Sequence, residues 1–245
     1  MKHKPTLLPV LFLLLIITSS QTVFGENPFR DPAIPTGETT TYTSRVGDKT
    51  MTVVEVVTLK KDGEKEVYEI ISRSDSLDRI LTLDKQTMSI ISVHTIRKFP
   101  EVTLDSKLKV LNEKPYEKEG EVKIADFAVI TYLFRGFPFT KREKLKIGFY
   151  GEDRGRKFAF SAHYKDTEEV TVNQKTVECY KIEFGLDGFW GTFLPKMNAW
   201  YTVDPPHYLV RYQGLVGPPG SPKRDVELLT YSIAGEEPNR TSNSE

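Results

Sequence analysis

The sequence has only one cysteine, Cys179, and only four histidines in 245 residues. A single cysteine excludes an internal disulfide, so the fold must rest on its hydrophobic core. Because Cys179 lies in the alternating strand pattern "TVECYKIEF", we predict a buried, inert thiol rather than a nucleophile. His94 and His163 stand alone in strand patterns, without the paired spacing of a metal site. We therefore predict neither a metal ion nor a cofactor.

An excess of charge of either sign is also missing, because 34 basic residues balance 34 acidic ones. No basic stripe stands out, which argues against nucleic acid as a partner. The sequence has no nucleophile-elbow pattern and no glycine loop of the kind that cradles phosphates. The absence of these catalytic and phosphate-binding motifs favours a protein that is not an enzyme.

Long hydrophobic runs are confined to the N-terminus. The run "LLPVLFLLLII" at residues 7–17 follows Lys2 and Lys4 and precedes a stretch of small and polar residues that ends at Gly25. This order is typical of a secretory signal peptide, and the run is short for a membrane span. We predict a cleaved signal peptide at residues 1–25, export to the periplasm, and no transmembrane segment in the mature chain.

The remaining residues predict one domain of mainly β structure. A proline-rich stretch, residues 26–36, should be an extended lead-in, and the polar residues 234–245 should form a disordered tail. Residues 37–233 form a single predicted domain. Runs rich in Val, Ile, Thr, Tyr and Phe follow one another there, separated by turn signals such as Asp62-Gly63. We expect about a dozen strands in a twisted antiparallel meander, curled into a barrel or half-barrel.

One segment, "DFAVITYLFRG" at residues 126–136, predicts a short helix instead. Asp126 is placed to cap its start, and Gly136 to end it in the left-handed conformation, with Arg135 beside the negative end. At 100° per residue, one side collects large apolar side chains, namely Phe127, Val129, Ile130, Leu133 and Phe134. The opposite side collects Ala128, Thr131, Tyr132 and Arg135. The helix could be a plug that completes the core or a lid over a ligand cavity.

The stretch "MNAWYTVDPPHYLVRY" at residues 197–212 groups residue types that also occur in active sites. We interpret it as a hairpin, with Asp204 and His207 in the turn. Pairing Val203 with Tyr208 sets a register, in which the partners are Tyr201 and Val210, Ala199 and Tyr212, Trp200 and Arg211, and Thr202 and Leu209. This register places Trp200 and Arg211 for a cation–π contact, and it predicts that His207 is neither catalytic nor a metal ligand.

Several of these segments resemble the bacterial exported family known as domain of unknown function 3108. The matching pieces are "PTGETTTYTSRVGDKTM", "DFAVITYLFRGFPF", "HYKDTEEVTVNQKTVECYKIEF", "AWYTVDPPHYLVRYQG" and "DVELLTY", spread over residues 35–233. The family is similar to the half-barrels of periplasmic lipoprotein carriers, in which a curved sheet wraps around a helix and can shelter acyl chains. The resemblance implies a fold and a compartment, and it implies no settled activity.

Together, the patterns favour a periplasmic protein without enzymatic activity that shelters an apolar ligand such as a lipid, or that supports the cell envelope. Two alternatives stay open: a scaffold for an envelope complex, with another envelope protein as its partner and no cavity, and a hydrolase with an unrecognised polar cleft. The residues predicted to bind the ligand are the aromatic and aliphatic side chains of the helix and of the glycine-rich segment 188–195, together with the hairpin tryptophan: Phe127, Ile130, Leu133, Phe134, Phe137, Trp190, Phe193 and Trp200.

Overall fold

The computed structural model describes residues 28–98, 101–109, 121–124, 129–139, 144–150, 156–188, 191, 194–216 and 220–235. The predicted signal peptide and most of the predicted tail lie outside these residues. Thirteen strands in the described part of the chain form one sheet, which confirms the prediction of a mainly β fold. The strands are β1 (Glu38–Val46), β2 (Lys49–Asp62), β3 (Lys65–Arg73), β4 (Leu77–Asp84), β5 (Ile90–Lys98), β6 (Thr103–Lys109), β7 (Glu121–Ile124), β8 (Lys144–Tyr150), β9 (Arg156–Val172), β10 (Lys175–Leu186), β11 (Met197–Thr202), β12 (Leu209–Leu215) and β13 (Lys223–Ile233).

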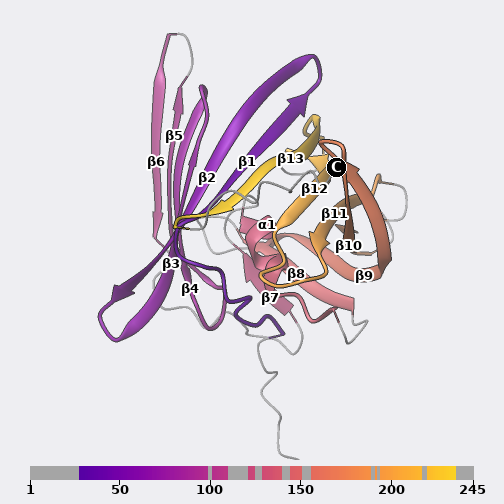
Figure 1. Ribbon diagram of the computed structural model, residues 1–245, viewed down its shortest axis with the longest axis horizontal. Coiled ribbons are helices and arrows are strands. Elements are labelled where there is room, and N and C mark those ends of the chain that lie inside the picture. The colour runs from indigo at the N-terminus through magenta and orange to yellow at the C-terminus, as the bar shows by residue number, and fades with distance from the viewer. Residues whose placement is uncertain are drawn as a thin grey trace, which may run out of the picture.

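The sheet is an open meander whose first and last strands meet in its middle. The strand order is β6-β5-β4-β3-β2-β1-β13-β12-β11-β10-β9-β8-β7. Neighbouring strands run antiparallel, except that β7 and β8 are parallel. In Figure 1, β2 to β6 form one wing of the molecule, and β8 to β12 curl around the short helix α1 (Ile130–Leu133). The pairing of β1 with β13 joins these two halves of a half-barrel.

Tight turns fix the register of the first hairpins. Val46 pairs with Lys49 across Gly47-Asp48, and Asp62 pairs with Lys65 across Gly63-Glu64. Both glycines have positive φ angles, 57° and 64°, and residues with a side chain rarely adopt this backbone conformation. These connections confirm the turn signals in the sequence.

The main hydrophobic core fills the concave side of the sheet. Every second residue at the start of β1 is buried, and this inward register includes Glu38, Thr40 and Ser44 as well as Tyr42. The lead-in also packs against this core, because Phe29 and Ile34 are 2% and 4% exposed. Polar groups therefore lie within the interior and need partners there.

The central helix is shorter than the sequence predicts. Its α-helical part covers only Ile130–Leu133, and a 3₁₀ turn, η2 (Phe134–Gly136), follows directly. The N-cap is Val129, which makes no side-chain capping bond, and the predicted cap residue Asp126 lies outside the described residues.

The predicted role of Gly136 was wrong, because Gly136 does not adopt the left-handed conformation and the chain leaves η2 through the extended residue Phe137. A glycine is needed here because another backbone approaches closely. A Cβ atom on Gly136 would lie 2.2 Å from the carbonyl oxygen of Arg30, and the Arg30 amide donates to the Gly136 carbonyl at 3.0 Å.

The side of the helix opposite its predicted apolar face is also buried, since Tyr132 and Arg135 are 6% and 3% exposed. The Tyr132 hydroxyl donates to Glu55 at 2.7 Å, and Arg135 pairs with Glu38. Ion pairing, rather than the helix dipole, accounts for Arg135. The helix is a plug that is buried on both sides, and the sheet surrounds it.

The hairpin at residues 197–212 forms, with a partly different register. Ala199 pairs with Tyr212 and Trp200 with Arg211, as predicted. Tyr201 pairs with Leu209 rather than Val210, because a β-bulge shifts the register after Trp200. Consequently Thr202 is not paired with Leu209, and its amide donates to the Tyr208 carbonyl at 3.1 Å. The bulge turns Leu209 toward the main core, while Val210 joins a second cluster.

Candidate functional site

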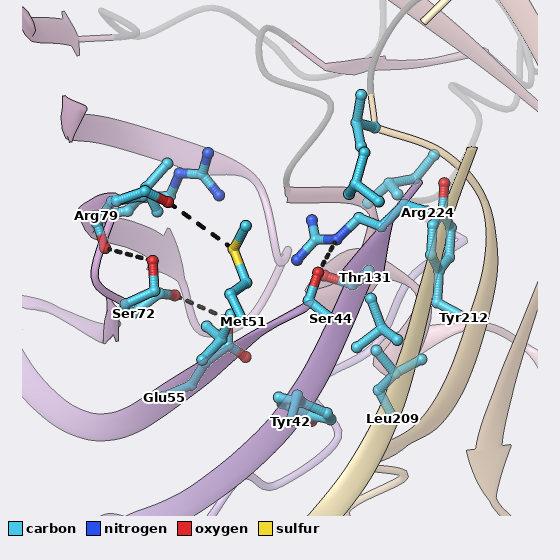
Figure 2. A pocket seen from close by; sticks show the side chains of 18 of the residues that line it. Tyr42, Ser44, Met51, Glu55, Ser72, Arg79, Thr131, Leu209, Tyr212 and Arg224 are labelled. Carbon is cyan, nitrogen blue, oxygen red and sulfur yellow. Dashed lines mark hydrogen bonds between the residues drawn. The ribbon is translucent and has the colours of Figure 1, made fainter. Parts of the chain in front are cut away.

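A cavity of about 420 Å³ lies between the two halves of the sheet. Its walls come from β1 to β5 on one side and from β12 and β13 on the other, and Ile130 and Thr131 of α1 also line it. Figure 2 shows side chains from both halves facing this space. The volume lies within the range of sites that hold small ligands.

Apolar side chains form the part of the wall next to the helix. The best buried of them are less than 10% exposed and come from four strands and α1: Tyr42, Val53, Ile130, Leu209, Tyr212 and Val226. Met51, which lies across the space from Arg224 in Figure 2, adds a flexible thioether to the lining of the cavity. This part of the cavity can shelter a hydrocarbon chain.

Glu55 is the carboxylate among the described lining residues, and it is already engaged. Its two oxygens accept hydrogen bonds from the Ser72 hydroxyl at 2.8 Å and from the Tyr132 hydroxyl at 2.7 Å. Burial raises the pKa of Tyr132 well above its ordinary value, and the charge of Glu55 raises it further. Tyr132 therefore remains a neutral donor that holds Glu55 against the wall.

Among the residues that the structure describes, three arginines also line the cavity: Arg79, Arg97 and Arg224. Arg224 is half-buried, and its Nε donates to the buried Ser44 hydroxyl at 2.9 Å. Burial lowers the pKa of the Arg224 guanidinium, and the nearby charge of Arg79 also lowers it, while Glu55 and Tyr212 raise it. In the described part of the chain, no carboxylate forms an ion pair with Arg224. Its charge is therefore exposed to whatever occupies the cavity.

The structure brings one of the predicted ligand-binding residues to this cavity, Ile130. Leu133, Phe134 and Phe137 are at most 4% exposed and pack into the main core. The aromatic rings of Phe134 and Phe184, for example, meet edge to face with their centroids 5.1 Å apart. Phe127, Trp190 and Phe193 lie outside the described residues.

Trp200, also predicted to bind the ligand, does not line this cavity and lies on the face of the sheet opposite to the main core. Its neighbours Ala199 and Tyr201 face the main core, so the alternation of β11 turns Trp200 to the opposite face. There it packs in a small cluster with Val170, Val172, Cys179 and Val210.

Trp200 makes two cation–π contacts in that cluster, and the hairpin predicts the one with Arg211. The Arg211 guanidinium carbon lies 6.0 Å from the ring centroid, and the Lys181 ammonium lies 5.3 Å from it. The indole N–H donates to Glu168, which also pairs with Lys181 at 3.2 Å. These contacts stabilise the outer face of the sheet and are remote from the cavity.

Cys179 and His207 have surroundings that favour structural roles. Cys179 is fully buried, and burial raises the pKa of its thiol to about 12. The Nδ1 atom of His207 lies 2.9 Å from the Thr202 carbonyl oxygen, and burial lowers the pKa of its imidazole. Over the residues that the structure covers, no group of three or more His, Cys, Asp or Glu side chains could hold a metal ion.

The charged residues of the cavity were missed by the sequence reasoning. A signal was present, because Ser44 shares the inward face of β1 with Tyr42, and Glu55 shares the inward face of β2 with Val53 and Val57. Polar residues in an inward register indicate either internal pairing or a polar site. Two of their partners could not be found from the sequence, since Arg224 comes from the distant strand β13 and Tyr132 from the helix.

None of the described helices is long and apolar enough to cross a membrane.

Comparison with known proteins found no matching family model and no matching curated protein. The resemblance to the family of domain of unknown function 3108 therefore stays a prediction. The chain is similar in backbone arrangement to the hypothetical lipoprotein YmcC from Escherichia coli, with 11% identity, a TM-score of 0.33, and coverage of 80% of this chain and 89% of that one.

A beta-barrel-like protein of domain of unknown function DUF1849 from Brucella abortus is also similar, with 9% identity, a TM-score of 0.44, and coverage of 83% of this chain and 100% of that one. A third similar structure is that of an exported protein with a YmcC-like fold from Bacteroides fragilis. Its identity is 11%, its TM-score is 0.33, and the match covers 84% of this chain and 99% of that one.

Proposed function

We propose that this chain is an exported binding protein without enzymatic activity, which shelters the apolar part of a ligand between the two halves of its sheet. The cavity of about 420 Å³, with its apolar wall beside α1, is the observation that carries this proposal. The signal-peptide pattern of residues 1–25 supports export and a periplasmic location.

The energetics of burial favour such a role. Each methylene group that leaves water for an apolar wall contributes about 0.8 kcal/mol. A chain of about ten methylenes therefore gains roughly 8 kcal/mol, from which association subtracts several kcal/mol. The remainder of roughly 4 kcal/mol corresponds to an affinity near the millimolar range. Binding of this strength suits a carrier that must also release its ligand.

The polar groups of the cavity support binding rather than catalysis. Glu55 accepts from two hydroxyl groups and is fixed against the wall, so it is poorly placed to act as a general base. Cys179 lies in the outer cluster, with a raised thiol pKa, and cannot serve this cavity as a nucleophile.

A cavity-filling substitution tests the proposal. Leu209 is 7% exposed and lines the cavity, whereas Leu229 on β13 is 37% exposed on the surface. We expect Leu209→Trp to weaken binding of the neutral fluorescent probe N-phenyl-1-naphthylamine about tenfold or more, because the indole occupies the space of the probe. Leu229→Trp is the matched control and should bind the probe like the parent protein.

Native mass spectrometry of protein purified from an export host gives an independent measurement. We expect a co-purifying apolar molecule on the parent and on Leu229→Trp, and less of it on Leu209→Trp. Absence of probe binding by the folded parent protein, together with bare protein in the mass spectra, would remove the binding role and leave the scaffold alternative.

A further inference from the structure

The charged residues around the cavity point to the chemistry of the ligand's polar end. We propose that the cavity takes a single-chain amphiphile with an anionic head group, a carboxylate or a phosphate monoester, and that Arg224 binds this head group while the hydrocarbon chain lies along the apolar wall. This inference rests on the proposed binding function and adds the class of ligand.

The first step is the imbalance of charge. Among the described lining residues, three arginines face one carboxylate, Glu55. Glu55 accepts from Ser72 and Tyr132, so it makes a fixed part of the wall and offers no ion pair to Arg224. An anion bound at Arg224 would supply the ion pair that no described carboxylate gives to this guanidinium.

The second step is the way Arg224 is held. Its Nε is fixed by Ser44, which is 1% exposed, so the donors at the other end of the guanidinium are left for a ligand. Figure 2 shows this guanidinium reaching past Ser44 into the space that faces Met51. A planar guanidinium held in this way matches the two oxygens of a carboxylate or phosphate. Partial desolvation strengthens such a pair relative to one in water.

The third step is the position of Arg224 between two hollows. A second cavity of about 420 Å³ shares Arg224 and Leu215 with the first. Its other described charged residues are Arg45, Lys196, Lys223 and Asp225, and the carboxylate of Asp225 also contacts Arg211 at 3.4 Å. A head group at Arg224 would therefore lie in a positive field. The apolar wall begins on the side of Arg224 that faces the first cavity.

The experiment compares two probes with the same chain length. Dodecanoate and dodecanol differ in the charge of the head group, and both are titrated below their aggregation limits against bound N-phenyl-1-naphthylamine. We expect dodecanoate to displace the probe at a concentration at least about tenfold lower than the concentration of dodecanol that is needed, because the anionic head group accepts charge-assisted hydrogen bonds. Dodecyl phosphate should behave like dodecanoate.

Substitution of Arg224 assigns the effect to a residue. We expect Arg224→Gln to remove the preference for dodecanoate and to leave the affinity for dodecanol unchanged. Lys181→Gln is the matched control, because Lys181 contacts Trp200 on the outer face of the sheet and lines neither cavity, so it should leave the preference intact. Inorganic phosphate tests for a free-anion site, and it should fail to displace the probe or to compete with dodecyl phosphate at millimolar concentration.

Each outcome has a distinct meaning. If neither probe nor amphiphile binds the folded protein, the proposed function fails and this inference fails with it. If dodecanol binds as well as dodecanoate, the function stands and the anionic head group is overturned. If inorganic phosphate competes as well as dodecyl phosphate, the site is for a free anion and the amphiphile is overturned. Should Arg224→Gln not fold, the ratio of dodecanoate to dodecanol affinity in the parent protein decides.

Discussion

Arg135 and Glu38 form a bidentate ion pair inside the protein, although they are separated by 97 residues in the sequence. The two N–H···O distances are 2.6 and 2.8 Å, and the two side chains are 4% and 1% exposed. The Nε of Arg135 donates to the Pro206 carbonyl at 3.1 Å, and the Tyr231 hydroxyl donates to Glu38 at 3.4 Å. This pair fastens the central helical segment to β1, to the turn before β12, and to β13.

The first prediction concerns this pair. We expect Arg135→Met to lower the free energy of unfolding by about 3–5 kcal/mol, because it leaves the Glu38 carboxylate buried and unpaired. Urea denaturation followed by circular dichroism measures the loss. The double variant Glu38→Gln/Arg135→Met is the control, and it should recover part of the stability because no buried charge remains. Equal losses in the single and double variants would contradict the role of the ion pair.

The second prediction concerns the close approach at Gly136. We expect Gly136→Ala to lower the free energy of unfolding by about 1–3 kcal/mol, because the added Cβ meets the backbone of Arg30, which cannot turn away as a side chain could. Gly63→Asn is a control at an open turn, where nothing lies within 4 Å and asparagine tolerates the positive φ. The control should change stability by only a few tenths of a kcal/mol. An unchanged denaturation midpoint for Gly136→Ala would mean that residues 30 and 136 are not in contact.

The third prediction concerns alkaline pH. Burial raises the pKa of Tyr42, Tyr132 and Tyr201 above the ordinary value, and the charge of Glu55 adds to this effect at all three. The stability from these neutral phenols is fully present below about pH 10, and it falls as pH rises further, because the unfolded chain then releases protons that the folded chain retains. Each tyrosine contributes a slope of about 1.4 kcal/mol per pH unit above pH 10.

Thermal denaturation between pH 8 and pH 11.5 measures this dependence. The absorbance of ionised tyrosine at 295 nm provides a control, because the part that belongs to buried tyrosines should appear together with unfolding. Complete ionisation of all tyrosines while the circular dichroism of the sheet is retained would contradict the prediction.

The strands and the first turns were predicted from the sequence because both depend on short-range effects. Alternation along β1 and β10 follows from the period of two in an extended chain. Glycine is favoured at positions 47 and 63 because φ is positive there. The pairing of Trp200 with Arg211 was predicted for the same reason, since the two residues belong to one hairpin. The prediction failed at the next pair, where a bulge in β12 changes the register without a strong local signal.

The tertiary structure alone decided which faces become interior and which side chains meet. A helix with one apolar side predicts packing on a single sheet, but here the sheet surrounds α1, so that Tyr132 and Arg135 are buried and require partners. Those partners, Glu55 and Glu38, come from β2 and β1, and no local pattern links them to the helix. The cavity with Arg224 arises in the same way, because its walls are brought together by the pairing of β1 with β13. Local backbone preferences act over a few residues, whereas charge pairing and cavity shape depend on contacts between strands that are far apart in the chain.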